Sequence, residues 1–129
     1  MRTLLTVAAV ASLIASPAAA NQFLDYFEYG RAELSPRGYR MVRAVADYAR
    51  HGHPSRVLIV GHMDTAEAEE FSDELSRRRA QAVATELVNL GIDPSMIEQQ
   101  GRGASLLART TPPNTPEPLN RRVSVDVNF

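Results

Sequence analysis

An amphipathic segment, residues 69–90, is the feature that most constrains the fold of this chain. When residues advance by about 100° each, as in an α-helix, most of its apolar side chains fall within an arc of about 160°. These side chains are Phe71, Leu75, Ala82, Val83, Leu87 and Leu90. Gly91 follows as a C-terminal stop. A helix with one apolar face must cover a core that other elements supply.

Short segments elsewhere in the chain predict the strands of a sheet. Residues 56–60 are aliphatic at their centre and end at Gly61, and residues 23–29 are aromatic and end at Gly30. Residues 121–129 alternate cleanly, which places three valines on one face: Val123, Val125 and Val127. Residues 99–103 can add a fourth strand.

A first helix begins at Ser35 and Pro36, a cap residue followed by proline at the first helical position. Residues 93–97 can form a short helical turn, and the prolines of residues 112–118 mark an irregular loop. The elements follow the order β-α-β-α-β-β. This order predicts an α/β (α+β) sandwich, in which two main helices cover one face of a mixed sheet of about four strands.

The N-terminus is typical of an export signal. Residues 1–20 combine Arg2, a short apolar run and three alanines at residues 18–20, so residues 21–129 are expected to form one exported domain in the periplasm. The apolar run is too short to span a bilayer, and no other segment of the mature chain is a transmembrane candidate. The chain has no Cys, which excludes a lipid-modified cysteine, disulfides and thiolate metal sites. Its net charge of −1 argues against nucleic acid as a partner.

Arg79 lies at about 80° on the helical wheel of residues 69–90, in the middle of the apolar stripe. A guanidinium that points toward a core needs an anion, because burying an unpaired charge is very unfavourable. The anion can be internal, from Asp126, Asp64 or a glutamate, or it can be the carboxylate of a ligand. Arg79→Leu would stabilise the chain if Arg79 served only a ligand, and destabilise it if Arg79 held an internal acid.

Four motifs occur in register along the chain: FEYGRAEL at residues 27–34, GHMD at 61–64, LSRRRA at 75–80 and NRRV at 120–123. Together they resemble the OmpA-like C-terminal domain, also found in peptidoglycan-associated lipoproteins and flagellar motor stator proteins. The family pattern reads roughly GHTD, LSxxRA and NRRV. The chain resembles this domain over nearly all of residues 21–129, as a stand-alone exported domain.

The resemblance implies non-covalent binding of peptidoglycan at the cell wall or outer membrane. Its ligand would be the meso-diaminopimelate of the peptide stem, which carries an ammonium and a carboxylate on one carbon. Asp64 would accept the ammonium, and Arg79 would hold the carboxylate. Further ligand-binding positions are implied at Met63, Ser72, Gly30, Ala32 and Arg122. Arg122 is preferred to Arg121 because side chains alternate along a strand, and only one of the two can share the side of Asn120.

Three departures from the family pattern leave other interpretations open. Met63 replaces a threonine, Glu67 a glycine and Ser72 an asparagine, and Glu67 adds charge beside Asp64. The chain could therefore be a protein-interaction module of the cell envelope that kept the fold and lost wall binding. Residues 64–67 also have capping-box spacing, so Asp64 could simply start a helix.

A metal or hydrolytic site is not expected. His51, His53, His62 and Asp64 include suitable ligand types, but the strand of residues 56–60 separates the first two from His62 by about 20 Å. The sequence contains no recognisable set of nucleophile, base and orienting group. We therefore expect neither an enzyme nor a metal or cofactor, with peptidoglycan and envelope proteins as the partners.

Overall fold

The computed structural model describes residues 21–129, so the export-signal prediction for residues 1–20 lies outside the described residues. Four strands form one mixed sheet in the order β1-β4-β2-β3, in which β2 is parallel to β3 and β4 is antiparallel to both β1 and β2. The strands are β1 (Gln22–Tyr26), β2 (Arg56–Gly61), β3 (Ile97–Gly101) and β4 (Arg122–Asn128). The helices are α3 (Pro36–Gly52), α4 (Thr65–Glu70) and α5 (Glu74–Asn89). The predicted fold class is confirmed.

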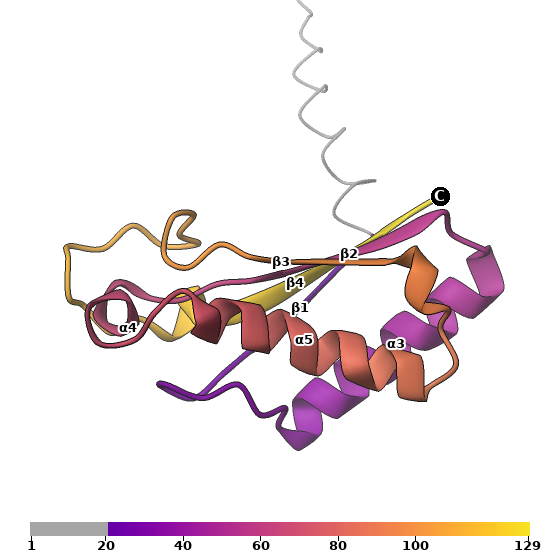
Figure 1. The fold of residues 1–129 in the computed structure, drawn as a ribbon, viewed down its shortest axis with the longest axis horizontal. Helices are drawn as coiled ribbons and strands as arrows, with labels where there is room; N and C mark the ends of the chain where they lie inside the picture. The colour runs from indigo at the N-terminus through magenta and orange to yellow at the C-terminus, as the bar shows by residue number, and fades with distance from the viewer. Residues whose placement is uncertain (1–20) are drawn as a thin grey trace, which may run out of the picture.

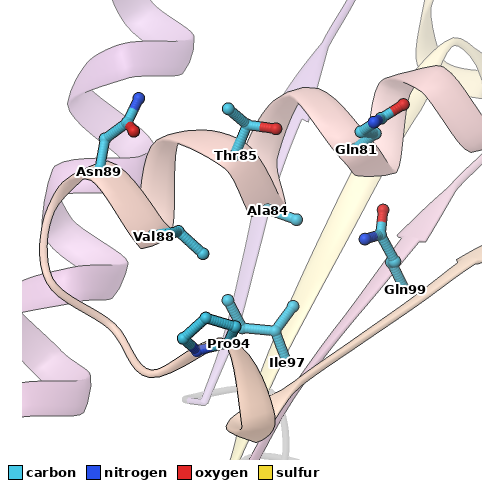
Figure 2. A pocket seen from close by; sticks show the side chains of 8 residues that line it. All are labelled: Gln81, Ala84, Thr85, Val88, Asn89, Pro94, Ile97 and Gln99. Atoms are coloured by element: carbon cyan, nitrogen blue, oxygen red, sulfur yellow. The ribbon is translucent and has the colours of Figure 1, made fainter.

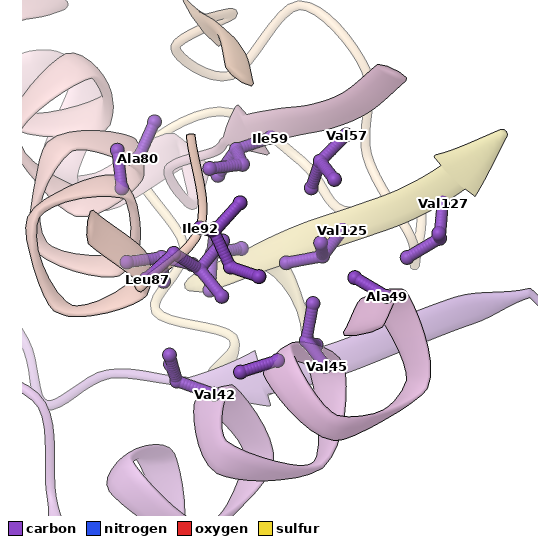
Figure 3. Close-up of a cluster of buried hydrophobic side chains, with 14 of the residues drawn as sticks. Val42, Val45, Ala49, Val57, Ile59, Ala80, Leu87, Ile92, Val125 and Val127 are labelled. Carbon is purple, nitrogen blue, oxygen red and sulfur yellow. The ribbon is translucent and has the colours of Figure 1, made fainter. Parts of the chain in front are cut away.

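Helices α3 and α5 lie on the same side of the sheet and enclose the core between them and the strands (Figure 1). The valines that alternate along β4 all point into this core and are fully buried. They belong to one cluster with apolar side chains of both helices, among them Val42, Val45 and Ala49 of α3 and Leu87 of α5 (Figure 3). The period of 2 residues thus places the β4 valines as the sequence predicts. Of the predicted helical stripe, Leu75, Val83 and Leu87 are buried, whereas Phe71, Ala82 and Leu90 are only partly buried.

Two glycines allow the first turns of α5 to lie directly on the sheet. A Cβ atom at Gly61 would come within 1.9 Å of the Ser76 carbonyl oxygen, and one at Gly101 within 2.7 Å of the Arg77 backbone nitrogen. Gly61 and Gly101 are the last residues of β2 and β3. The N-terminal part of α5 is therefore held against the carboxyl ends of these two strands.

The prediction of one continuous helix over residues 69–90 is wrong. The chain instead forms α4, breaks at Phe71, where φ is −124° and ψ is 159°, and resumes as α5. Asp64 caps α4 and starts it early, while the extended backbone at Phe71 carries its ring onto Tyr29, with 5.8 Å between the ring centroids. The predicted helix is therefore divided in two, with a cap at Asp64 and an aromatic contact of Phe71 where the apolar periodicity predicted a continuous helix.

Other element boundaries differ by a few residues. β1 ends at Tyr26 rather than at residue 29, and β3 begins two positions before the predicted residue 99. Short 3-10 turns lie at Pro94–Met96, as expected, and at Pro118–Asn120, just before β4. Within residues 21–129, every helix is too short or too polar to cross a membrane.

Candidate functional site

The residues that carry the family resemblance converge where β2 ends. The turn after β2 supplies Asp64, the first half of α5 supplies Arg79, and the loop after β1 supplies Gly30. The side chains of Asp64 and Arg79 are both fully buried, with 0% of their surface exposed. Both are therefore enclosed by other protein groups.

Glu67, in the first turn of α4, pairs with Arg79 through two parallel hydrogen bonds. Arg79 Nη2 donates to Glu67 Oε2 at 2.5 Å, and Arg79 Nη1 donates to Oε1 at 2.8 Å. Both side chains are 0% exposed. The internal acid that the sequence left open as a partner of Arg79 is thus a glutamate, the one that replaces the family glycine.

The remaining N–H groups of Arg79 bind backbone carbonyls. Nε donates to Arg31 O at 2.8 Å, Nη1 to His62 O at 2.8 Å, and Nη2 to Glu28 O at 3.3 Å. The Phe27 ring lies beneath the guanidinium, 5.1 Å from Cζ to the ring centroid. All five donors of the guanidinium are therefore used, as a buried arginine requires.

Asp64 is the N-cap of α4. Its Oδ1 accepts the Glu67 N–H at 2.7 Å, and the Glu67 side chain accepts the Asp64 N–H at 3.2 Å, which completes a capping box. Its Oδ2 accepts the Glu117 N–H at 3.0 Å and Arg121 Nη1 at 3.0 Å. The interpretation of Asp64 as a helix cap is confirmed, and both carboxylate oxygens are engaged within the protein.

Arg121, rather than Arg122, lies beside Asp64. Arg121 also donates from Nε to Phe27 O at 3.0 Å, whereas Arg122 Nη2 donates to Leu106 O at 3.3 Å. The preference for Arg122 is therefore corrected: the arginine that contacts Asp64 is Arg121. Arg121 precedes β4 and closes the 3-10 turn before it, with φ −89° and ψ 78°, so strand alternation does not apply to it.

The other predicted ligand-binding residues differ in how closely they contact Asp64, Glu67 and Arg79. Gly30, at φ 70°, donates its N–H to Glu67 Oε2 at 2.7 Å and belongs to the same cluster. Met63 is fully buried, and its N–H donates to Gly103 O at 2.8 Å. Ala32 is half-buried. Ser72 is exposed, and its hydroxyl accepts the Glu74 N–H at 3.4 Å. Of these four residues, Gly30 therefore lies closest to the cluster, because it binds the same Glu67 carboxylate as Arg79 does.

Sequence reasoning did not assign Glu67 and Arg121 to the site. The capping-box spacing pointed to Glu67 as a helix-start residue, but it did not show that the same carboxylate reaches Arg79, twelve positions later. Strand alternation favoured Arg122, but the turn before β4 decides which of the two arginines meets Asp64, and it is Arg121.

His62, next to this cluster, is a buried neutral side chain. Only 2% of it is exposed, and its Nδ1 atom has no hydrogen-bond partner among residues 21–129. Burial, together with the positive charges of Arg122 and Arg102, lowers the pKa of His62 to about 4. Within residues 21–129, no three His, Asp or Glu side chains come together as metal ligands would.

A separate hollow of about 280 Å³ lies between α5 and β3. Figure 2 shows its lining, which comes from α5, the turn before β3 and β3 itself: Gln81, Ala84, Thr85, Val88, Asn89, Pro94, Ile97 and Gln99. None of the residues implied by the family resemblance lines it.

The chain is similar in sequence to proteins of the bacterial outer membrane and cell envelope. The chain is 33% identical over 116 residues to an outer membrane protein of Gluconacetobacter diazotrophicus, covering 85% of this chain and 31% of that protein. It is 32% identical to the peptidoglycan-associated lipoprotein of Pseudomonas aeruginosa, covering 78% of this chain and 59% of that protein. The chain thus spans less than two thirds of either relative.

Solved structures agree with this similarity. The OmpA-like domain of FopA1 from Francisella tularensis superposes with a TM-score of 0.72 at 26% identity, covering 82% of this chain and 70% of that chain. The OmpA family model matches residues 26–121, a range that contains Asp64, Arg79 and Arg121. The chain therefore belongs to the OmpA family.

Proposed function

We propose that this chain is a domain of the bacterial cell envelope that binds peptidoglycan non-covalently. Its family membership supports this proposal, as does its 32% identity to a protein named for its association with peptidoglycan. The location would be the periplasm, at the cell wall or the outer membrane. The proposed activity is binding, without a catalytic step.

The ligand we propose is the diaminopimelate of the peptide stem. Its ammonium would bind Asp64 and its carboxylate would bind Arg79. One observation carries this assignment: Arg79 and the Gly30 N–H together already hold a carboxylate, that of Glu67, through three hydrogen bonds of 2.5–2.8 Å. A forked guanidinium with an added backbone donor is a receptor for a carboxylate group.

The same observation also favours a second candidate function. Asp64 and Arg79 are both satisfied by protein groups in this structure, Asp64 by Arg121 and Arg79 by Glu67. A site that is complete without a ligand is what an envelope interaction module that has lost wall binding would have. Its partners would then be other envelope proteins.

Co-sedimentation with purified insoluble peptidoglycan tests the two candidates. We expect the parent chain to sediment with diaminopimelate-type wall in preference to lysine-type wall. Asp64→Asn should reduce binding at least tenfold, roughly the effect of losing one charged hydrogen bond, because it removes the charge that meets the ammonium. Asp47→Asn is the matched control, since the exposed Asp47 lies on α3 and its carboxylate bonds Arg50.

Two outcomes would count against the proposal. If Asp64→Asn, shown to be folded by circular dichroism, sediments like the parent, the wall does not bind at Asp64. If neither the parent nor a Glu67→Ala variant, which lacks the internal carboxylate, sediments with either wall type, the interaction module is the better account.

A further inference from the structure

The carboxylate of Glu67 occupies a receptor that other segments build. Four donors surround it: Arg79 Nη1 and Nη2, the Gly30 N–H at 2.7 Å and the Asp64 N–H at 3.2 Å. These donors come from α5, the loop after β1 and the turn after β2. The carboxylate that they bind belongs to a residue of α4, Glu67.

The orientation of Arg79 does not depend on Glu67 alone. Three backbone carbonyls, those of Arg31, His62 and Glu28, accept from the same guanidinium. Carbonyl oxygens fix its direction, but they do not neutralise its charge. Without Glu67, the protein would therefore present a buried, oriented cation that needs one carboxylate.

The segment that carries Glu67 is the less anchored partner. Helix α4 has six residues, a length at which a helix has little stability of its own. Side-chain hydrogen bonds attach its two ends: Thr65 to residues 111–115, and Glu70 to the exposed Tyr29 hydroxyl at 2.7 Å. Arg79, by contrast, lies in the 16-residue α5, which packs on the sheet.

We infer that Glu67 is a built-in competitor that closes the carboxylate receptor formed by Arg79 and Gly30, and that a ligand carboxylate enters only when Glu67 leaves. This inference rests on the proposed function, because the peptide stem is the ligand that would displace Glu67. The observed affinity would equal the intrinsic affinity multiplied by the fraction of molecules whose site is open. Glu67 would thus determine how strongly this member of the family binds.

Rescue by an added carboxylate tests the inference without using the wall. Glu67→Ala removes the internal carboxylate, and Glu69→Ala, on the exposed side of α4, is the matched control. At constant ionic strength, added acetate or diaminopimelate should raise the Tm of Glu67→Ala by about 4 °C or more at saturation. The parent and Glu69→Ala should show a much smaller rise at the same concentration, because Glu67 competes with the added carboxylate there. A folded Glu67→Ala whose Tm does not respond would overturn the inference.

A second measurement applies if Glu67→Ala does not fold. In the parent chain, diaminopimelate that displaces Glu67 should speed exchange of the α4 amides of Glu67, Ala68 and Phe71, which now bond to Asp64 or Glu67. The amides in the middle of α5 serve as the internal reference and should not change. Unchanged exchange in α4 at millimolar diaminopimelate would contradict displacement.

Wall binding separates this inference from the proposed function. If Glu67 competes with the wall, Glu67→Ala should bind peptidoglycan about tenfold or more tightly than the parent, as expected when a mostly closed site becomes open. If the carboxylate rescue succeeds and no variant binds the wall, the receptor exists but its ligand is not peptidoglycan. If the parent binds the wall and the rescue fails, the wall binds elsewhere or without displacing Glu67.

Discussion

Glu67 and Arg79 form a fully buried ion pair between α4 and α5, with hydrogen bonds of 2.5 and 2.8 Å and neither side chain exposed. The pair connects a six-residue helix to the helix that packs on the sheet. A buried pair of this kind is costly to break from one side, because the remaining charge has no partner. It therefore links the stability of the domain to the state of its candidate site.

Arg79→Leu and Glu67→Met should each lower the free energy of unfolding by about 3–5 kcal/mol. The double substitution should recover most of that loss, because it replaces two buried charges with apolar groups of similar size. Urea denaturation of the two single variants and the double variant, as a double-mutant cycle, measures the coupling. Simple addition of the two losses would contradict the buried pair.

Asp64→Ala should destabilise the domain by more than the roughly 1 kcal/mol of a lost N-cap. The extra loss arises because Arg121 loses its partner at 3.0 Å. Asp64→Asn keeps an acceptor for the Glu67 N–H and should lose less. Asp73→Ala is a suitable control, since Asp73 precedes α5 without a side-chain cap bond. Equal denaturation midpoints for the Ala and Asn variants at position 64 would show that the cap contributes nothing.

His62 should make the domain less stable in mild acid. Because its pKa is lowered to about 4 in the folded chain, the unfolded chain takes up a proton first as the pH falls below about 6.5. Proton uptake by His62 in the unfolded chain should lower the free energy of unfolding by about 1.5 kcal/mol between pH 6.5 and 5. It should be absent in His62→Gln. His51→Gln, at an exposed position, should keep the slope of the parent; the same slope in all three chains would exclude His62 as its source.

Gly61→Ala should destabilise the domain by several kcal/mol, roughly what overpacking against an immovable neighbour costs. Its new methyl group would meet the Ser76 carbonyl, which belongs to the backbone of α5 and cannot move alone. Gly52→Ala provides the contrast, because there the methyl group would meet the ring of Phe129, an exposed C-terminal side chain. Thermal denaturation should show a large loss for the first variant and a small one for the second. A comparable loss in both would argue against the close contact between α5 and β2.

Local patterns were enough to predict the architecture of this domain. Alternation along residues 121–129 placed Val123, Val125 and Val127 in the core, where all three are fully buried. Helical periodicity placed Arg79 on the inner face of its helix, and its side chain is 0% exposed. Each inference needed only the geometry of a single element, which the order of apolar and polar residues specifies.

The partners within the candidate site required the tertiary structure. The sequence alone predicted that an inward Arg79 needs an anion and that Asp64 stands at a helix start. That Glu67 supplies the anion, and that Arg121 rather than Arg122 meets Asp64, depends on where α4 breaks and on the turn before β4. Pairing between separate segments is set by how loops bring elements together, and no periodicity within one element records it.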